Sequence, residues 1–439
     1  MYRYICIYIY ICLQGAFILV GAEYGVTGFM DGNIFDRSSV YQYMEVIPDG
    51  SQDKPYCNIS CSEPMKNQEA FQTSSCIAKQ NGIYLTVNLI EEVPCTGRGC
   101  PQDGHYQYNT NLIYNSDGCL IGKYHKTHMF EEEKVRLNRP PVPQYVYFDT
   151  EYGRFGTMIC MDILFHDPAI SMVEKYGVRH ILFPTAWDQS NDYVWLKSVE
   201  IHNAFAKRIG VNFLASNIRE HSDWFAGSGI YTANGILNYT YDMRDDEGTI
   251  VTGVLEYNIK PTKLTPLTGP TITQNLPPSR PIFSPIHNVS IYNNTYRAVV
   301  LEGLSGRASV CYGELCCNLD YSRSGNSETY ILAAYNGLQV LEGVFWVEIC
   351  LVYRCSSSDL TTCHNRESAS LTKFSLFKLY ANFKADYVFP NVMPSGYKFR
   401  KIDWKFIREE KNYNAIEFSS NWPAVSAAMM GRDYDKDPE

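Results

Sequence analysis

Basic residues are scarce relative to acidic ones in this chain. Lysine and arginine number 38 against 47 aspartates and glutamates, the formal net charge is −9, and no basic run offsets it. A general nucleic-acid binder needs a basic surface to meet phosphates, so that class is excluded. Internal repeats and low-complexity tracts are missing as well. The C-terminal residues GRDYDKDPE are polar, so we expect no hydrophobic tail of the kind that signals a lipid anchor.

The chain otherwise has the composition of an ordinary globular protein. Its 439 residues are 45% hydrophobic and 19% charged, which is enough for two or three domains with a large core. Tyrosine is common, with 34 residues, and this favours a β-rich protein.

The 15 cysteines cluster, and their number is odd. Such close spacings predict a disulfide framework formed in an oxidising compartment. A zinc site is the alternative, but it would need matching histidines, and we favour disulfides for pairs such as Cys95 with Cys100 and Cys350 with Cys355. An odd number leaves at least one thiol free. Cys160, far in sequence from the other clusters, is the candidate.

Four N-glycosylation sequons accompany the cysteines, at Asn58, Asn238, Asn288 and Asn293. Together the two features predict a secreted, extracellular glycoprotein.

The N-terminal run YICIYIYICLQGAFILVGA resembles a signal peptide or signal anchor. Cleavage after Ala22 would make Glu23 the mature N-terminus and remove its strand. We therefore interpret the run as a hydrophobic leader or truncated N-terminus, 1–12, that merges into a core strand. No stable membrane span is expected.

Up to about residue 258, short apolar β-type runs alternate with helical stretches. The expected strands are 17–20, 83–90, 146–150, 155–160, 180–184 and 211–216. Expected helices cover 167–176, where Asp-Pro opens the first turn, and 192–209, which stops at a glycine. This alternation predicts an α/β domain with a layered sheet core.

The remaining chain has a different character. A proline-rich stretch, 259–285, predicts a linker or draped loop, and the residues after it combine aromatic and β-branched runs with most of the late cysteines. We therefore expect two domains, 13–258 and 286–439, the second all-β and stapled by disulfides. Six late cysteines alone allow 15 pairings, and the sequence leaves them open.

Three segments of the first domain each contain a residue with a reactive or charged side chain. They are GAEYGVTGF with Glu23, GKYHKTHMFEEE with Lys126, and FGTMICMDILFHDPA with Cys160. Each lies near a β-type run, where α/β folds place their functional residues. A thiolate can attack an amide carbonyl, a carboxylate can take the thiol proton and later activate water, and an ammonium can stabilise the thiolate and the oxyanion.

In this order and context, the segments resemble the nitrilase superfamily, whose members use a Glu–Lys–Cys triad. The resemblance is closest to the vanin and biotinidase branch. SCIAKQNGIYLTVNL, CPQDGHYQYNTNLIYNSDG, PTAWDQS and GSGIYTANG are similar to segments of that branch, and VCYGELCCNLDYS is similar to its second domain. The resemblance implies a nitrilase-like α-β-β-α sandwich as catalytic domain, followed by a β-rich vanin-type C-terminal domain.

The resemblance also implies residue roles. Cys160 would be the nucleophile that forms a thioester, Glu23 the general base, and Lys126 the stabiliser of thiolate and oxyanion. The backbone N–H of Met161 would complete the oxyanion hole, and Asp162 would orient the loop after the nucleophile.

Other residues of these segments leave alternatives open. Tyr106, Tyr108, His166 and Trp187 are candidates for lining the pocket, with packing or hydrogen bonding as the alternative. One member of the glutamate run 131–133 could orient the lysine, but the sequence does not show which.

His125 and His128 flank Lys126 at a metal-like spacing. The family uses no metal, and we expect local packing there. No cofactor is implied, because the nucleophile, base and oxyanion donors all come from the chain.

The expected reaction is hydrolysis of a linear amide in a small-molecule substrate. Within this branch the substrates are pantetheine, which gives pantothenate and cysteamine, and biocytin, which gives biotin and lysine. Pantetheine is the first choice and biocytin the alternative. A non-catalytic secreted protein of the same fold is a further hypothesis, because the strand and helix that precede residues 17–20 in the family have no counterpart in the sequence.

Overall fold

The structure is a computed structural model that describes most of the chain. The described residues are 15–28, 36–48, 62, 67–131, 133–189, 195–219, 225–242, 248–257, 285–291, 293–325, 327–339, 344–364, 369–396, 400–409 and 412–438. The leader 1–12, the sequon at Asn58 and the proline-rich stretch up to residue 284 lie outside these ranges.

A first sheet gathers the N-terminal strands. Its strands are β1 (Ile18–Val20), β2 (Met44–Glu45), β3 (Tyr84–Pro94), β4 (His105–Tyr114) and β5 (Leu120–His125). They run in the order β1-β3-β4-β5, with β2 also paired to β3. Strand β1 is parallel to β3, and β3, β4 and β5 are antiparallel. The carboxyl ends of β1 and β5 lead directly into the segments of Glu23 and Lys126.

A second sheet follows in the chain. Its strands are β6 (Val146–Thr150), β7 (Gly153–Thr157), β8 (His180–Thr185), β9 (Asn212–Asn217), β10 (Ser228–Thr232) and β11 (Gly235–Thr240), in the order β11-β10-β9-β8-β7-β6. The central pairs β7–β8 and β8–β9 are parallel, and the flanking pairs are antiparallel. The parallel centre brings the carboxyl ends of β7 and β8 to the same edge.

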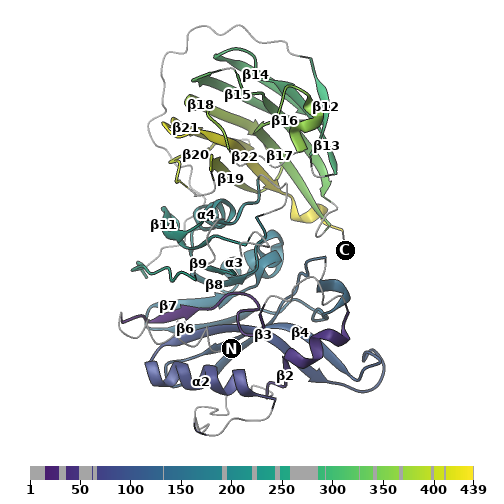
Figure 1. The fold of residues 1–439 in the computed structure, drawn as a ribbon, viewed down its shortest axis with the longest axis vertical. Coiled ribbons are helices and arrows are strands. Elements are labelled where there is room, and N and C mark those ends of the chain that lie inside the picture. Colours follow the sequence, from purple (N-terminus) through teal and green to yellow (C-terminus); the bar gives the residue numbers. More distant parts are fainter. Residues whose placement is uncertain are drawn as a thin grey trace.

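The two sheets face each other between helical layers (Figure 1). Ile113, Phe155 and Leu182 fill the space between the sheets. Helix α2 (Glu69–Asn81) covers the first sheet through Phe71, and helices α3 (Ser171–Glu174) and α4 (Ser198–Ile209) cover the second. The expected α-β-β-α sandwich is therefore confirmed.

Helix boundaries differ from the sequence prediction. Helix α2, which ends at the left-handed Gly82, was not predicted. The helix expected over 167–176 is a single π-helical turn (His166–Ile170) followed by the short α3. Helix α4 begins at Ser198 rather than at residue 192, because the carbonyls just before it serve other partners: Asn391 donates to that of Trp195 and the Trp187 indole to that of Leu196.

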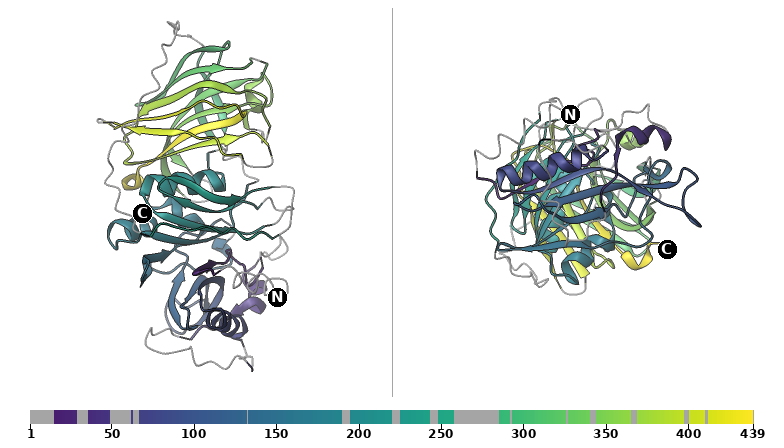
Figure 2. Two further views of the ribbon diagram at one scale, coloured as in Figure 1. Left: turned by 90° about the vertical axis from the view of Figure 1, so that its left-hand side faces the viewer. Right: turned by 90° about the horizontal axis from the view of Figure 1, so that it is seen from below.

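The chain from residue 287 onward forms a β-sandwich (Figures 1 and 2). One sheet has the order β12-β13-β16-β17-β22-β19 and the other the order β14-β15-β18-β21-β20. The strands are β12 (His287–Ile291), β13 (Asn294–Val300), β14 (Ser305–Tyr312), β15 (Leu315–Arg323), β16 (Tyr330–Gln339), β17 (Phe345–Arg354), β18 (Phe374–Asn382), β19 (Tyr387–Pro394), β20 (Lys405–Arg408), β21 (Tyr413–Phe418) and β22 (Ala424–Arg432). The predicted all-β second domain is confirmed.

Disulfides staple this sandwich, as predicted. Cys311–Cys316, Cys317–Cys350 and Cys355–Cys363 are bonded there, and Cys95–Cys100 closes a loop between β3 and β4. Cys76 and Cys119 are disulfide-bonded too. Among the described cysteines Cys160 is the free one.

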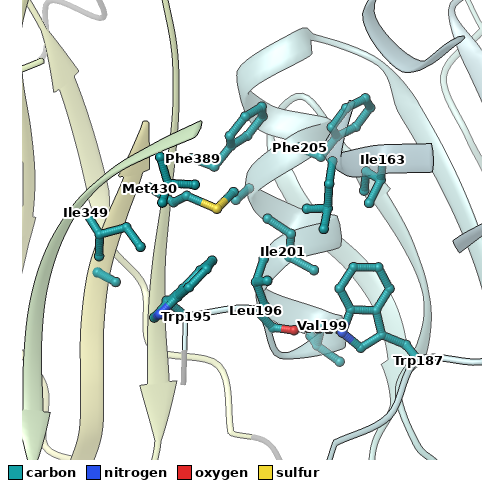
Figure 3. Close-up of a cluster of buried hydrophobic side chains, with 14 of the residues drawn as sticks. Ile163, Trp187, Trp195, Leu196, Val199, Ile201, Phe205, Ile349, Phe389 and Met430 are labelled. Atoms are coloured by element: carbon teal, nitrogen blue, oxygen red, sulfur yellow. Dashed lines mark hydrogen bonds between the residues drawn. The ribbon is translucent and has the colours of Figure 1, made fainter. Parts of the chain in front are cut away.

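The sandwich docks on the outer face of α4. Figure 3 shows this junction, where Phe389 of β19 and Met430 of β22 meet the apolar side chains of α4. The rings of Phe205 and Phe389 stack with their centroids 6.1 Å apart. Helix α4 is thus covered on both sides, which explains why ten of its twelve residues are buried. None of the described helices is long and apolar enough to cross a membrane.

Candidate active site

Glu23 lies in the turn that follows β1 and is fully buried. The next residue, Tyr24, adopts a positive φ of 56°. Its backbone N–H donates to Oδ1 of Asn88 at 2.6 Å, which ties the turn to β3. The turn thereby aims the Glu23 carboxylate into the space between the sheets.

Lys126 follows β5, and its ammonium lies between two carboxylates. Its Nζ is 2.7 Å from Oε1 of Glu23 and 2.6 Å from Oε2 of Glu133. Glu133 belongs to a short 3-10 helix (Glu133–Val135), and its Oε2 also accepts the backbone N–H of Phe130 at 2.8 Å. Of the glutamate run, Glu133 is therefore the member that holds the lysine, whereas Glu131 pairs with Lys134 at the surface.

Cys160 begins a 3-10 helix (Cys160–Leu164) at the end of the β7 segment. Its φ is 45°, in the left-handed region, where a residue other than glycine carries strain of about 1–3 kcal/mol. Strain of this kind collects at functional sites when surrounding contacts enforce it. Here Asp162 enforces it, since its carboxylate accepts the N–H groups of Ile159 and His128 and the hydroxyl of Tyr124.

The backbone of Ala186, just past β8, links the carboxylate of Glu23 to the thiol of Cys160. Its N–H donates to Oε2 of Glu23 at 2.6 Å, and its carbonyl accepts the Cys160 thiol at a sulfur–oxygen distance of 3.9 Å. Three strand ends from both sheets therefore bring Glu23, Lys126 and Cys160 to one buried point. Lys126 contacts Glu23, which lies 103 residues away in sequence, and Cys160 contacts Ala186, which lies 26 residues away.

The electrostatics of this cluster separate the two carboxylates. Burial raises the pKa of Glu23, with the charge of Glu133 adding to the shift and Lys126 opposing it. Burial acts the same way on Glu133, but the charge of Lys126 and the hydrogen bonds from Lys126, Tyr24 and Asn109 together outweigh it and lower the pKa of Glu133 below its usual value. When neighbours push two carboxyl pKa values apart, the one with the raised value is the proton acceptor. Glu23 is thus the more basic of the pair.

Lys126 and Cys160 complete this charge balance. Burial lowers the pKa of Lys126, but Glu133 and Glu23 more than offset it, so that the net pKa is raised and the ammonium stays charged. Burial and the charge of Glu23 raise the pKa of Cys160 well above its usual value, against the pull of Lys126. The resting sulfur is therefore a protonated thiol, and its reaction requires a base.

Met161 is the second residue of the 3-10 helix that Cys160 opens. Backbone N–H groups in the first turn of a helix have no acceptor within it. The role of the Met161 N–H as an oxyanion donor stays a prediction.

The other residues predicted to line the pocket have different surroundings. Trp187 directly follows Ala186, and it is held by the carbonyl of Leu196 at 2.7 Å and by Asn217. Tyr106 donates to the carbonyl of Gly99 in the β3–β4 loop, and its ring stacks on Tyr108, which in turn stacks on His125. His166 is half-buried at the domain junction, with its ring 5.5 Å from that of Tyr434.

The two histidines beside Lys126 point to different neighbours. His125 stacks on Tyr108 and bonds Glu91 at 2.7 Å. His128 stacks on Phe165 and bonds the carbonyl of Asp167 at 2.6 Å, and burial lowers its pKa to about 4. In the part of the chain that the structure describes, no group of three histidine, cysteine or acidic side chains is arranged to hold a metal ion.

The three described sequons lie on β-hairpins. Asn288 and Asn293 are exposed at the β12–β13 hairpin, and Asn238 is an exposed residue of β11 whose amide donates to the carbonyl of Thr252. Their modification stays a prediction.

Sequence reasoning missed two buried asparagines at the site. Asn109 of β4 touches both carboxylates, and Asn88 of β3 holds Asn109. A signal was present, because Asn109 and Asn111 stand two apart in a β-type run and must share a face. An amide on the inward face of a buried strand needs a partner.

Comparisons with known proteins match both halves of the chain. Residues 11–201 match the Carbon-nitrogen hydrolase family, and residues 287–437 match the Vanin C-terminal domain. Pantetheinase of Bos taurus is 35% identical over 431 residues, covering 97% of this chain and 81% of that protein, and pantetheinase of Homo sapiens is 34% identical over 443 residues with the same coverage. Biotinidase of Takifugu rubripes is 33% identical over 406 residues, covering 87% of this chain and 78% of its own.

Among solved structures, Nit3 of Saccharomyces cerevisiae, a nitrilase-superfamily member, matches with a TM-score of 0.40 and 22% identity. The match covers 57% of this chain and 80% of that one.

Proposed function

Because the chain belongs to the vanin and biotinidase branch of the carbon–nitrogen hydrolases, we propose that it hydrolyses pantetheine through a thioester on Cys160. One observation carries the assignment of residues. The free thiol of Cys160 and the ammonium of Lys126 both meet the buried carboxylate of Glu23, the thiol through the Ala186 peptide and the ammonium directly.

In the first half of the reaction, Glu23 takes the proton of the Cys160 thiol as the sulfur attacks the amide carbonyl. The N–H of Met161 and the ammonium of Lys126 stabilise the oxyanion that develops. Collapse of the tetrahedral intermediate breaks the carbon–nitrogen bond, and Glu23 passes its proton to the departing amine. Cysteamine leaves, and the pantothenoyl group stays as a thioester on Cys160.

In the second half, a water molecule replaces the amine. Glu23 takes a proton from the water as its oxygen attacks the thioester carbonyl, and the same donors stabilise the second oxyanion. Collapse releases pantothenate, and the proton on Glu23 returns to the sulfur. One water is consumed, and the carboxylate and thiol end as they began.

Glu133 supports this cycle without touching the substrate. Its lowered pKa keeps it ionised while Glu23 exchanges protons, so that Lys126 always faces at least one negative charge. We assign Glu133 as the residue that positions Lys126, and Glu23 as the base, because a raised pKa suits the group that must accept a proton.

Pantetheine is favoured as substrate by the pantetheinases that match 97% of the chain at 34–35% identity. Hydrolysis of biocytin is the second candidate, because biotinidases match at 32–33% identity. Both reactions use the same thioester chemistry, and the acyl group that fits the pocket decides between them.

The assay that tests this proposal measures thiol release from pantetheine by the purified full chain, with Cys160→Ala as the control. We expect release that the substitution abolishes. Release of lysine from biocytin in place of cysteamine from pantetheine would move the assignment to the second candidate. Absence of both, from folded protein, would favour the non-catalytic alternative.

We also propose that the protein is a secreted glycoprotein whose catalytic domain spans residues 13–258 and whose accessory domain spans 286–439. Disulfides in both halves support formation in an oxidising compartment. The exposed sequons at Asn238, Asn288 and Asn293 support glycosylation.

A further inference from the structure

Asn109 on β4 is fully buried, and its side chain touches both carboxylates that flank Lys126. Its Nδ2 donates to Oε1 of Glu23 at 2.7 Å and to Oε1 of Glu133 at 2.8 Å. Its backbone carbonyl accepts the N–H of Lys126 at 2.9 Å. One residue of one strand thereby contacts Glu23 from the first segment and both Lys126 and Glu133 from the second.

The orientation of this amide is determined by its other neighbour. Asn88 on β3 donates its Nδ2 to Oδ1 of Asn109 at 2.7 Å, and its own Oδ1 is occupied by the N–H of Tyr24 at 2.6 Å. Oδ1 of Asn109 must therefore face β3, and its Nδ2, with two hydrogens, must face the carboxylates. A flipped amide would leave two buried carboxylates facing an oxygen, which is unfavourable.

The two oxygens of Glu23 consequently have unequal surroundings. Among the described residues, Oε1 accepts hydrogen bonds from Lys126 and Asn109, whereas Oε2 accepts one, from the N–H of Ala186. A carboxylate offers about two lone-pair positions on each oxygen. Oε2 thus keeps a position open, and it lies beside the Ala186 peptide whose carbonyl contacts the Cys160 sulfur.

We propose that Asn109 is a positioning residue of the reaction: its amide occupies Oε1 of Glu23, so that the proton of the Cys160 thiol moves to Oε2 on the side of the sulfur. The inference rests on the proposed function for the role of Glu23 as base. In this role Asn109 acts through the groups that its amide contacts, which are the two glutamates and, at 3.1 Å, the hydroxyl of Tyr24.

The titratable groups facing Glu23 come from every segment around it. Lys126 follows β5 and Glu133 lies in the 3-10 helix after it, Tyr24 follows β1 and donates to Glu133, and Cys160 lies past β7. Asn109 is an uncharged side-chain donor to Glu23, and hydrogen bonding to an ionised carboxylate favours the ionised form. Its loss therefore raises the pKa of Glu23 further and shifts ionisation of the base to higher pH.

The test uses Asn109→Leu, which keeps the volume and removes the donor. Asn111→Leu is the matched control, because Asn111 lies two residues away on the same face and also accepts from Nδ2 of Asn88, but donates to Thr157 and not to a carboxylate. The readout is the rate of alkylation of Cys160 by iodoacetamide as a function of pH, followed by mass spectrometry of the Cys160 peptide. This measurement needs no substrate.

We expect the acid limb of the alkylation profile to move to higher pH by about one unit in Asn109→Leu and to stay in place in Asn111→Leu. An unmoved limb in Asn109→Leu, or equal movement in both variants, would overturn the proposal.

If Asn109→Leu does not fold, Asn109→Ser, which keeps one donor, decides: a smaller shift in the same direction supports the proposal, and no shift overturns it. Wild-type protein that shows the limb but hydrolyses neither pantetheine nor biocytin would refute the proposed function and leave the positioning role standing.

Discussion

At the scale of single residues, the site depends on keeping one carboxylate basic and one ionised around a shared lysine. Glu23 and Glu133 are both buried and both bond Lys126, yet their pKa values shift in opposite directions. The asymmetry comes from their other partners. Asn109 donates to both carboxylates, but Glu133 additionally accepts from Tyr24 and the N–H of Phe130, and these donors stabilise its charge.

Replacement of Glu133 by glutamine should therefore lower kcat. Lys126 would lose its permanent counter-charge and its fixed position, and losing one charge-assisted hydrogen bond should cost about 10- to 100-fold in kcat. Steady-state kinetics with pantetheine measures this effect. Glu131→Gln is the matched control from the same glutamate run, since Glu131 pairs with Lys134 at the surface, and it should leave kcat unchanged. Equal loss in the two variants would contradict the assignment.

At the scale of elements, helix α4 contains a buried acid, Glu200, whose burial outweighs the opposing charge of Lys197. Both oxygens of Glu200 are buried and have no hydrogen-bond partner among the described residues, and burial raises its pKa to about 8. Glu200 is therefore neutral in the folded protein at neutral pH and ionised in the unfolded chain. Below an unfolded pKa of about 4.3 both states bind the proton, and the stability of the fold is unaffected.

As pH rises from that value to about 8, only the folded state keeps the proton, so the free energy of unfolding should fall by up to about 1.4 kcal/mol per pH unit. Glu200→Gln removes the ionisation and should flatten this part of the curve. Urea unfolding at pH 5 and at about pH 8 tests it, with Glu151→Gln, an exposed glutamate, as the control that follows wild type. A wild-type curve parallel to that of Glu200→Gln would show that Glu200 does not titrate in this range.

At the scale of the whole molecule, the accessory sandwich contacts the loop that carries Cys160, the proposed nucleophile. Arg432, at the end of β22, is fully buried, and its Nε donates to the carbonyl of Leu164, the last residue of the 3-10 helix that Cys160 opens. Its guanidinium also pairs with Asp437 at 2.6 Å. The apolar junction in Figure 3 excludes water from the neighbouring surface. The second domain thereby contributes a direct hydrogen bond to the catalytic loop.

Arg432→Met keeps an apolar stem at this junction, removes the Arg432 donor from the Leu164 carbonyl, and leaves Asp437 with the N–H of Trp346 but without its cation. Breaking a buried ion pair from one side should cost about 3 kcal/mol of stability. It should also slow alkylation of Cys160, because the loop loses an anchor. Lys436→Met is the control, since Lys436 pairs with Asp433 at a partly exposed site and should cost less than about 1 kcal/mol. Unchanged alkylation in Arg432→Met would show that the loop is held from within the catalytic domain alone.

The sequence by itself determined the fold class, the disulfide-stapled β domain and the three segments of the site. Short apolar β-type runs and glycine stops are local signals, and the strands at 83–90, 146–150, 180–184 and 211–216 are all present within a few residues of their predicted ends. Helix α4 ends at Gly210 as predicted, because a glycine in the left-handed region ends a helix wherever it is placed.

Only the tertiary structure decided which side chains meet. The choice of Glu133 over Glu131, the bridging role of Asn109, the disulfide partners and the later start of α4 depend on contacts between segments far apart in the chain, such as the 103 residues that separate Glu23 from Lys126. Residue type and spacing along a strand indicate on which face of the sheet a side chain lies. They do not indicate which residues pack against that face. Sheet order and the docking of the second domain determine this, and both depend on burial of the whole apolar surface.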